Sequence, residues 1–578
     1  MRVSDYIIKF LKEKEGIDTF FTLSGGGCIF LVDSLTNIDG VKYIATHHEQ
    51  AASIAAEGYA RLNQRMGACV VTSGPGGTNA ITGVLGAWLD SIPVIVISGQ
   101  VNKEMSTNYT QLPLRQLGDQ EFNIIESVKN MTKYAIQVND EKDIRYHLEK
   151  ACSLAKSGRP GPVWLDIPLN VQSANIDENT LVGYTNTNTE ITATPNQISL
   201  VVSKLREAKR PLLIVGNGIR LASGVNELRE LVNKINIPVI SAVNGNDLVN
   251  EDYNGYVGRF GTHAQICANQ LLAEADLILS IGSRLYVRQI GYNFKSFASK
   301  AFKIYVDIDE NELNKPTLFP DLAIHSDAKS FIIKLLQETL STTSNDWFSY
   351  CVKKYKNTPT VLDKHRKKDK IVSHYHFMEK LSGKLNENDH IVTSDGSANV
   401  VTMQVMKLTG NQRLITNTGN APMGYGLPAA IGAAANGTKI ICIEGDGSLH
   451  LNIHELQTIK HYNLPIRLIL FNNDGYTSIK ISQKTFFNGK YVASEKSSGV
   501  SFPKFEKIIN AYELPYLSIK NHSEIDEKLD EFLSKDGPVV LEVFTDPDEF
   551  HEPKVMASLS SEGKFIPGVL ENIKWVDG

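Results

Sequence analysis

Three residues in the C-terminal third have the types and spacing to bind a metal ion. Asp446 lies in a Gly-Asp-Gly-Ser turn directly after the apolar run 440–443. Asn473 and Gly475 lie in Asn-Asn-Asp-Gly, directly after the next apolar run. If these runs are strands of one parallel sheet, both turns lie at the edge where ligands bind in open α/β folds. A carboxylate, an amide oxygen and a turn carbonyl would then offer Mg²⁺ three oxygens and leave positions for diphosphate oxygens and water.

An aspartate in such a turn has an ordinary alternative, because it can simply cap the helix that follows. The paired asparagines at the next strand end favour the metal and diphosphate site over a cap around Asp446. A second candidate, Glu49, follows the stretch 43–46 and precedes the small-residue helix expected over 51–61. By itself this glutamate is typical of a solvated first helical turn, where the helix dipole favours a carboxylate.

The elements that must position these residues alternate along the whole chain. Short β-branched runs are followed by helical patterns, as in parallel sheets with crossover helices. Two polar segments, 172–197 and 341–370, interrupt the alternation and are interpreted as linkers; the second ends in the charge run 364–370. We therefore predict an α/β fold of three parallel-sheet domains flanked by helices. The expected domains are 1–171, 195–340 and 371–550, followed by a tail, 551–578.

Composition and charge exclude several classes of protein. The chain has 578 residues, 42% of them hydrophobic and 21% charged, which is ordinary globular usage. A net charge of −5 offers no basic field for nucleic acid. The longest apolar runs, such as 93–98 and 466–471, are far shorter than the roughly 20 residues of a membrane span. The N-terminus lacks a secretory signal and the six cysteines form no CxxC pair, so we expect a cytoplasmic protein without nucleic-acid or membrane partners.

Taken together, the motifs resemble those of thiamine-diphosphate enzymes of the acetolactate synthase family. The resemblance includes the turn at 445–447 with Asn473, the segment around Glu49 and Gly-Arg-Pro-Gly-Pro-Val-Trp-Leu-Asp-Ile-Pro at 158–168, and it runs along nearly the whole chain. It implies bound thiamine diphosphate and Mg²⁺, with a pyrimidine-binding first domain and a diphosphate-binding third domain. Glu49 matches the glutamate that hydrogen-bonds the pyrimidine N1′ and so promotes loss of the cofactor's C2 proton.

The same resemblance assigns residues around the cofactor. Met423 matches the bulky apolar side chain that supports its bent shape, although a core methionine is the ordinary alternative. The Ala421 carbonyl matches the acceptor for the 4′-amino group. The remaining cofactor-binding residues that the resemblance implies are Ser73, Asp395, Gly396, Ser397, Ala398, Asn399, Gly447, Ser448, Tyr476 and Thr477.

The residues near position 120 bear on the type of reaction. Pyruvate decarboxylases carry a proton-donating histidine pair downstream of the glutamate, whereas the stretch 112–121 contains no histidine. The pair His47-His48 precedes Glu49 and does not match. Gln120 resembles the glutamine of acetolactate synthases, which donates a hydrogen bond to substrate without protonating the carbanion; a plain surface amide is the alternative. We therefore predict a carboligase that decarboxylates a 2-oxo acid, pyruvate, and transfers the acyl carbanion to a carbonyl acceptor.

Two departures leave parts of this function open. Where acetolactate synthases have a tryptophan that sizes the acceptor pocket, this chain has Ser482. The acceptor is either a second 2-oxo acid or a nucleotide-linked keto sugar. The central domain resembles the part that holds FAD in acetolactate synthases, but it reads Leu-Tyr-Val-Arg at 285–288 instead of Phe-Asp-Asp-Arg. Both an FAD-bound and a flavin-free state remain open, and a bound FAD would be structural.

The resemblance also implies a homodimer or homotetramer with sites at the subunit interface. Two rivals remain. One is a 2-oxo acid decarboxylase that does not ligate. The other is a catalytically inactive binding or regulatory homologue, although Glu49, Asp446 and Met423 are all present.

Overall fold

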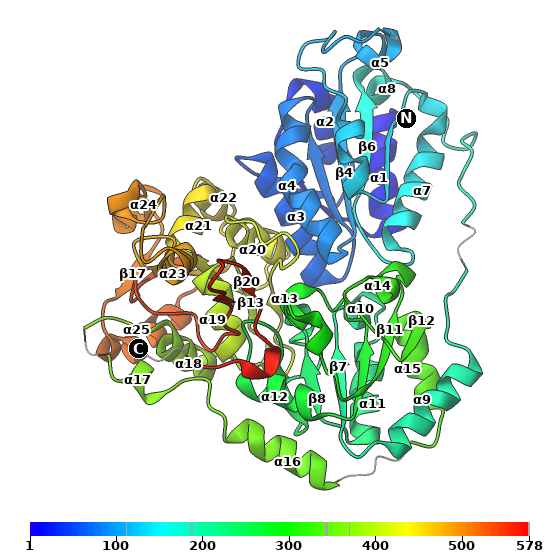
Figure 1. Cartoon of the computed structure of the whole chain (residues 1–578). Coiled ribbons are helices and arrows are strands. Elements are labelled where there is room, and N and C mark those ends of the chain that lie inside the picture. The colour runs from blue at the N-terminus through cyan, green and yellow to red at the C-terminus, as the bar shows by residue number, and fades with distance from the viewer. Residues whose placement is uncertain (111, 187–188, 341–344, 369, 576–578) are drawn as a thin grey trace.

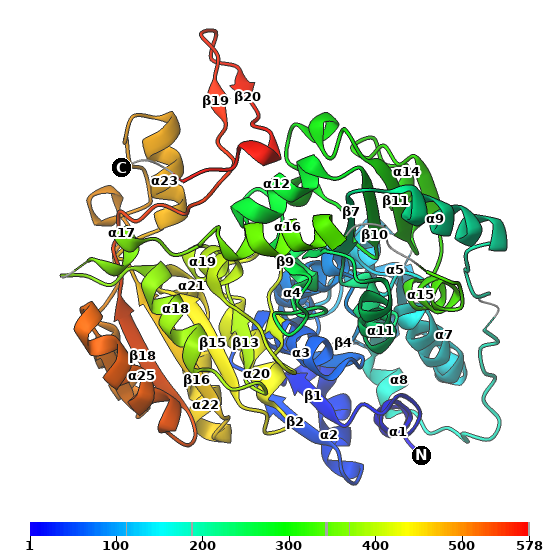
Figure 2. The same cartoon turned by 90° about the horizontal axis from the view of Figure 1, so that it is seen from below.

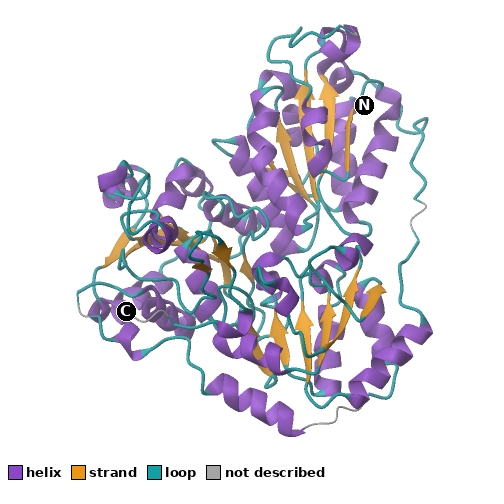
Figure 3. Ribbon diagram, in the orientation of Figure 1, coloured by secondary structure: helices purple, strands orange, loops and turns teal. Residues whose placement is uncertain are grey.

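The computed structural model describes residues 1–575 apart from 111, 187–188, 341–344 and 369. Three six-stranded sheets, each flanked by helices, make up the fold (Figures 1 and 3). The strand pairs recorded in these sheets are all parallel. The predicted α/β class with three parallel-sheet domains is therefore confirmed.

The first sheet has the order β2-β1-β3-β4-β6-β5. Alternate residues of its central strands face two separate apolar cores: Val70 and Ile95 contribute to one, and Cys69 and Val96 to the other. Its strands are β1 (Thr19–Thr22), β2 (Lys42–Ala45), β3 (Gly67–Val71), β4 (Val94–Gln100), β5 (Tyr134–Gln137) and β6 (Val163–Pro168). The helices around it are α1 (Val3–Glu15), α2 (Ile29–Asn37), α3 (Glu49–Asn63), α4 (Pro75–Asp90), α5 (Thr107–Thr110), α6 (Ile124–Val128), α7 (Ile144–Lys156) and α8 (Leu169–Ser173).

The third sheet has the order β14-β13-β15-β16-β18-β17. Numbered from the first strand of each domain, the first and third sheets share the order 2-1-3-4-6-5. The two domains thus have the same sheet topology, which their sequences alone do not reveal. The strands are β13 (His390–Thr393), β14 (Leu414–Ile415), β15 (Ile440–Gly445), β16 (Ile466–Asn472), β17 (Tyr516–Ile519) and β18 (Val539–Phe544). The helices are α18 (His374–Lys384), α19 (Ser397–Val405), α20 (Gly426–Ala434), α21 (Asp446–Leu451), α22 (Glu455–Tyr462), α23 (Thr477–Phe486), α24 (Phe505–Ala511) and α25 (Ile525–Ser534).

The central sheet has the order β12-β11-β10-β7-β8-β9, which is the strand order of dinucleotide-binding folds. The topological switch point therefore lies between β7 and β10. Its strands are β7 (Pro211–Val215), β8 (Val239–Ser241), β9 (Tyr256–Arg259), β10 (Leu277–Ile281), β11 (Phe302–Asp307) and β12 (Leu322–His325). Its helices are α9 (Pro195–Glu207), α10 (Gly218–Leu221), α11 (Val225–Ile235), α12 (Ile266–Glu274), α13 (Val287–Ile290), α14 (Glu310–Asn314) and α15 (Ala328–Leu336).

The first and third domains are joined through the helices α3 and α20, which lie side by side (Figures 1 and 2). A side chain at Gly58 would lie 2.2 Å from the Ala429 carbonyl oxygen, and one at Gly432 would lie 1.8 Å from that of Ala55. Only glycine allows this approach. Residues of both helices belong to a single apolar core, so the two domains are packed as one unit.

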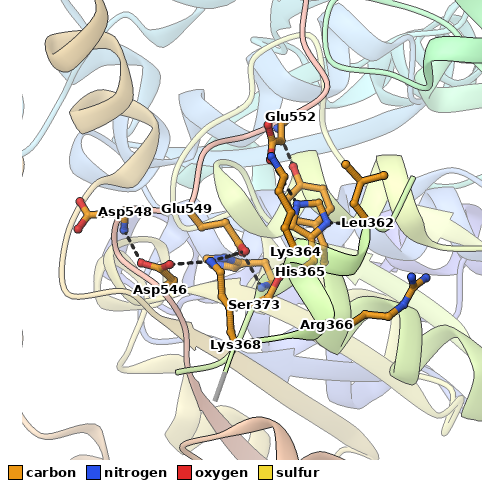
Figure 4. Close-up of polar contacts among 12 residues, drawn as sticks. Leu362, Lys364, His365, Arg366, Lys368, Ser373, Asp546, Asp548, Glu549 and Glu552 are labelled. Carbon is orange, nitrogen blue, oxygen red and sulfur yellow. Dashed lines mark hydrogen bonds and ion pairs between the residues drawn. The ribbon is translucent and has the colours of Figure 1, made fainter. Parts of the chain in front are cut away.

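Within the segment interpreted as a linker, residues 345–368 form helices and ion pairs with the rest of the chain. Helix α16 (Asn345–Lys356) packs on the central domain, where the Trp347 indole N–H donates to the Pro211 carbonyl at 2.9 Å. Lys368, in the charge run after α17 (Asp363–Arg366), pairs with Asp546 at 2.6 Å and Glu549 at 2.9 Å (Figure 4). Acidic residues far along the chain thus supply partners that no local pattern reveals.

The C-terminal tail continues over the third domain and forms a short hairpin, β19 (Ser558–Leu559) with β20 (Phe565–Ile566), that projects from the body (Figure 2). Across the described residues, every helix is too short or too polar to cross a bilayer.

Candidate active site

Asp446 begins α21 and is buried, with three backbone amides around its carboxylate. Its Oδ1 accepts from the N–H of Gly447 at 2.7 Å, and its Oδ2 accepts from those of Asn473 and Gly475 at 3.0 and 3.3 Å. Burial raises the pKa of this carboxyl to about 7, although the amides oppose the shift. Because β15 and β16 are neighbours, the two turns meet at one edge of the sheet.

Two buried oxygens near Asp446 have no hydrogen-bond partner within the described part of the chain. They are Asn473 Oδ1 and Thr477 Oγ1. A buried polar atom without a partner costs free energy, so both atoms indicate a place for a polar ligand. Oxygen ligands of this kind suit Mg²⁺. The residues therefore fit a magnesium diphosphate group.

Close packing brings Met423 and Tyr476 to Gly447. A side chain at Gly447 would lie 2.3 Å from Tyr476 Cε1 and 3.2 Å from Met423 Cε. The Ser448 hydroxyl accepts from the N–H of Gly424 at 2.8 Å, which ties α21 to the turn that carries Met423. Four residues assigned to the cofactor thus lie together beside Asp446.

The turn at residues 395–399 leads from β13 into α19. Gly396 has φ +70°, a left-handed conformation that favours glycine. Ala398 is fully buried in the apolar core. It lies at the start of α19, and free N–H groups at a helix start bind anions. The Asn399 amide donates to Thr416 at 2.5 Å, and the Ser397 hydroxyl contacts His551 Nε2 at 2.8 Å.

Glu49 is the first residue of α3 and is only 6% exposed. The Asn79 amide donates to Glu49 Oε2 at 3.0 Å, and His48 caps the helix by accepting from the N–H of Gln50. The solvated alternative for this glutamate is therefore wrong, because the side chain is buried. The neighbouring His47 N–H donates to Glu455 of α22 at 2.9 Å.

Gln120 and Ser73 lie at the strand ends of the first sheet. Gln120 is exposed, has φ +56°, and its carbonyl oxygen would lie 2.3 Å from a side chain at Gly74. This contact holds Gln120 against the turn that follows β3. Among the described residues, no recorded hydrogen bond or ion pair joins Glu49, Ser73 or Gln120 to the Asp446 cluster of the same chain.

Comparison with known proteins identifies the family. The thiamine pyrophosphate enzyme N-terminal, central and C-terminal domain models match residues 1–124, 198–335 and 395–543. The acetolactate synthase large subunit of Lactococcus lactis subsp. lactis is 31% identical over 569 residues, which cover 97% of this chain and 95% of the relative. The acetolactate synthase isozyme 2 large subunit of Escherichia coli K12 is 31% identical over 567 residues, covering 97% and 98%. The probable acetolactate synthase large subunit of Methanococcus aeolicus is 32% identical over 576 residues, covering 95% and 92%.

This chain belongs to the acetolactate synthase-like thiamine pyrophosphate enzymes. The three domain matches and the relatives confirm the predicted family and the prediction of a thiamine-diphosphate-dependent enzyme.

In this acetolactate synthase-like enzyme, a cavity of about 300 Å³ lies at the switch point of the central sheet. Gly216 after β7, Gly282 after β10 and Asp307 at the end of β11 line it. A side chain at Gly216 would lie 2.3 Å from the Gly282 carbonyl oxygen, so glycine is needed there. Burial raises the pKa of Asp307 to about 6. Arg159 of the first domain also lines the cavity and pairs with Glu312 at 2.7 Å.

Two residues around the acetolactate synthase-like site were not found from the sequence. His551 reaches Ser397 from the tail, and burial lowers its pKa to about 3, so the imidazole is neutral. No motif marks it. Glu444 precedes the Gly-Asp-Gly turn, accepts from the N–H of Leu427 at 2.7 Å and has a pKa that burial raises to about 7. An acidic residue inside an otherwise apolar strand was the available signal.

Proposed function

We propose that this enzyme decarboxylates a 2-oxo acid, pyruvate, and transfers the acyl carbanion equivalent to a carbonyl acceptor. The observation that carries the cofactor part is the buried Asn473 Oδ1 beside Asp446, which has no hydrogen-bond partner among the described residues. Thiamine diphosphate, when bound, supplies the electron sink for decarboxylation. The residues of this chain bind and orient the cofactor and the substrates, and they transfer protons.

Each group of residues has a separate task in this proposal. Asp446, Asn473 and the Gly475 carbonyl hold Mg²⁺, and the turn at 395–399 holds the diphosphate. Met423 would support the bound cofactor, and the Ala421 carbonyl would accept from its 4′-amino group. Glu49 exchanges a proton with the pyrimidine N1′.

Gln120 supports carboligation rather than release of aldehyde. Its amide can donate a hydrogen bond to a substrate oxygen, but it cannot act as an acid near neutral pH. The carbonyl of this residue packs on Gly74, which places it at the strand ends that also carry Ser73. His47 and His48 precede Glu49 and do not match the decarboxylase pair, and the His48 ring caps α3 by accepting from the Gln50 N–H.

The acceptor pocket is open at Ser482. This residue is exposed on α23, and its hydroxyl donates back to the Ser478 carbonyl at 3.1 Å. Ile479, on the same helix, is 48% exposed. A small residue at this position supports an acceptor larger than a 2-oxo acid, so a nucleotide-linked keto sugar is tested together with a second 2-oxo acid.

The deciding experiment supplies ¹³C-labelled pyruvate, thiamine diphosphate and Mg²⁺ with either a 2-oxo acid or a nucleotide-linked keto sugar. Mass spectrometry of the products then identifies the acceptor. Labelled acetaldehyde as the dominant product at saturating acceptor would favour the decarboxylase rival. Absence of labelled carbon dioxide would favour an inactive homologue.

We further propose a homodimer, or a homotetramer built from such dimers, in which Glu49 of one subunit serves the Asp446 cluster of the other. Exposed apolar side chains gather next to Gln120, including Tyr109 at 61% and Leu112 at 60% exposed, as expected for a surface that a partner covers. Co-expression of Glu49→Gln and Asp446→Ala chains tests the arrangement. A mixed dimer would contain one site with neither change, so activity should return. Sites made within one chain would give no recovery.

The central cavity is our proposed place for FAD, in a structural role. Its position at the switch point of a dinucleotide-type sheet supports this proposal. Flavin released on denaturation would be detected by absorbance and chromatography, and its absence would place the enzyme among flavin-free relatives. The six free, buried cysteines support our proposal that the enzyme works in the reducing cytoplasm.

A further inference from the structure

A buried ion cluster lies at the C-terminal ends of α3 and α4. The Arg61 guanidinium donates to Glu57 Oε1 through its Nε at 2.9 Å and to Asp90 Oδ2 at 2.7 Å. All three side chains are at most 8% exposed. Two carboxylates around one guanidinium exceed what charge pairing alone requires. A buried ion pair is by itself weak evidence for a stabilising role. The function of the cluster is therefore inferred from the other groups that its carboxylates bind.

Those other partners lie in the third domain, in the loop after β14. Glu57 Oε1 accepts from the Asn417 side-chain amide at 2.9 Å. Asp90 accepts from the backbone N–H groups of Thr418 and Gly419, each at 3.0 Å. A side chain at Gly419 would lie 2.6 Å from Leu89 Cβ, so the loop is pressed against the end of α4. The first domain therefore holds three consecutive residues of this loop.

The connection continues to the residue assigned to the cofactor's amino group. Asn417 Oδ1 accepts from the N–H groups of Asn420 and Ala421 at 3.1 and 3.2 Å. Ala421 has φ +49°, in the left-handed region that a side-chain-bearing residue adopts at a cost in free energy. The hydrogen bonds from Asn417 hold this conformation and so determine where the Ala421 carbonyl points. Met423 follows two residues later.

We infer that Arg61, Glu57 and Asp90 are positioning residues that act through Asn417 to orient the Ala421 carbonyl and Met423 toward the cofactor. This inference rests on the proposed function. None of the three touches the Asp446 cluster in the recorded contacts of the described chain, so the diphosphate clamp should not depend on them. Glu49, by contrast, lies at the opposite end of α3. The fold thus uses one helix both for the proposed acid–base group and for the support of the cofactor-shaping turn.

The test uses Asp90→Asn, which keeps the size of the side chain. The substitution replaces one accepting oxygen with a donor that faces a backbone N–H. Asn417→Ser is the second variant, because it removes the amide link and leaves all three charges in place. Tyr462→Phe is the matched control. The Tyr462 hydroxyl accepts from the Ala45 N–H at 2.9 Å, so it also joins the first and third domains but does not reach the turn.

The first readout needs no cofactor. Deuterium uptake by the backbone over residues 417–421, measured on the full-length protein by mass spectrometry, should rise in Asp90→Asn and Asn417→Ser and stay at the wild-type level in Tyr462→Phe. Equal uptake in all three variants and wild type would overturn the inference. So would an equal rise in Tyr462→Phe, because the link would then be a general domain contact.

The second readout is exchange of the C2 proton of bound thiamine diphosphate, with cofactor affinity measured separately. The two variants should exchange about 10- to 100-fold more slowly, the scale expected for a misplaced reactive group, with affinity changed less than the rate. A lower melting temperature with an unchanged rate of C2 proton exchange would show a purely structural role and overturn the inference. This readout does not depend on the acceptor. Normal wild-type exchange without coupled product would therefore reject carboligation alone.

Discussion

The side-chain amide of Asn79 donates to Glu49 Oε2 across 3.0 Å, from α4 to the first residue of α3. This contact occupies one oxygen of a buried carboxylate and leaves the other for a ligand. It also fixes the rotamer of Glu49, because α3 and α4 are packed against each other. A carboxylate held in this way is the group that we propose to contact the pyrimidine nitrogen.

Replacing Glu49 with Gln should slow proton exchange at C2 of bound thiamine diphosphate by about 10²–10⁴-fold, the usual cost of losing a positioned acid–base group. Glutamine keeps the size and a hydrogen-bonding oxygen but cannot share a proton with N1′. Affinity for cofactor and Mg²⁺ should change little, since the clamp lies in the third domain. NMR after deuterium quench measures the rate. Wild-type exchange in a folded variant would remove Glu49 from catalysis.

Asp446→Ala should abolish magnesium-dependent binding of thiamine diphosphate, because Asp446 is the carboxylate among the proposed ligands. Isothermal calorimetry with and without Mg²⁺ measures the effect. Asp474→Asn is the control: Asp474 is exposed in the same Asn-Asn-Asp-Gly turn, and asparagine tolerates its φ of +54°. Unchanged affinity in Asp446→Ala, or equal loss in the control, would contradict the metal assignment.

The wild-type enzyme should form coupled product in excess of free aldehyde when acceptor is saturating. Gln120→Ala should lower the coupled fraction, because the substrate oxygen loses its hydrogen-bond donor, while decarboxylation itself continues. Quantifying labelled acetaldehyde and coupled product in one reaction measures the ratio. Gln116→Ala is a suitable comparison, since Gln116 is exposed on the same loop and its amide donates to the Glu121 carbonyl instead. An identical ratio in wild type and Gln120→Ala would leave Gln120 as a surface amide.

Asp166 gives a prediction of pH dependence. It is 1% exposed on β6, and burial raises its pKa from 3.8 to about 7, although Ser98 and Gln100 donate hydrogen bonds to it. Because the folded-state pKa is the higher one, folding favours the protonated form. Its contribution to stability is therefore full below about pH 3.8 and is lost as the pH rises through about 7.

Asp166→Asn stays neutral at every pH, so it should flatten the pH dependence of the unfolding midpoint between the unfolded pKa of 3.8 and the folded pKa of about 7. The unfolding midpoint of the variant should therefore rise relative to that of the wild type as the pH increases. Urea titrations at several pH values measure this difference, with Asp39→Asn as an exposed control. Parallel curves for wild type and Asp166→Asn would show that the buried carboxyl does not titrate in this range.

The sequence alone determined the three-domain α/β class and the family. Strand periodicity and crossover helices are local features, and each predicted turn carries its own glycines next to the residues that bind. Asp446 and Asn473 could be placed together for the same reason: neighbouring parallel strands end at one edge of a sheet. Their roles in binding Mg²⁺ stay a prediction.

Only the tertiary structure decided which distant segments support that site. His551 reaches Ser397, Asn417 binds Glu57, and Lys368 pairs with Asp546, and none of these pairs is linked by a period or a motif. Glu49 shows the same limit, since its residue type fits a solvated helix start as well as a buried one. Such contacts depend on how the three sheets and their helices pack, and packing brings side chains more than 150 residues apart within hydrogen-bonding distance.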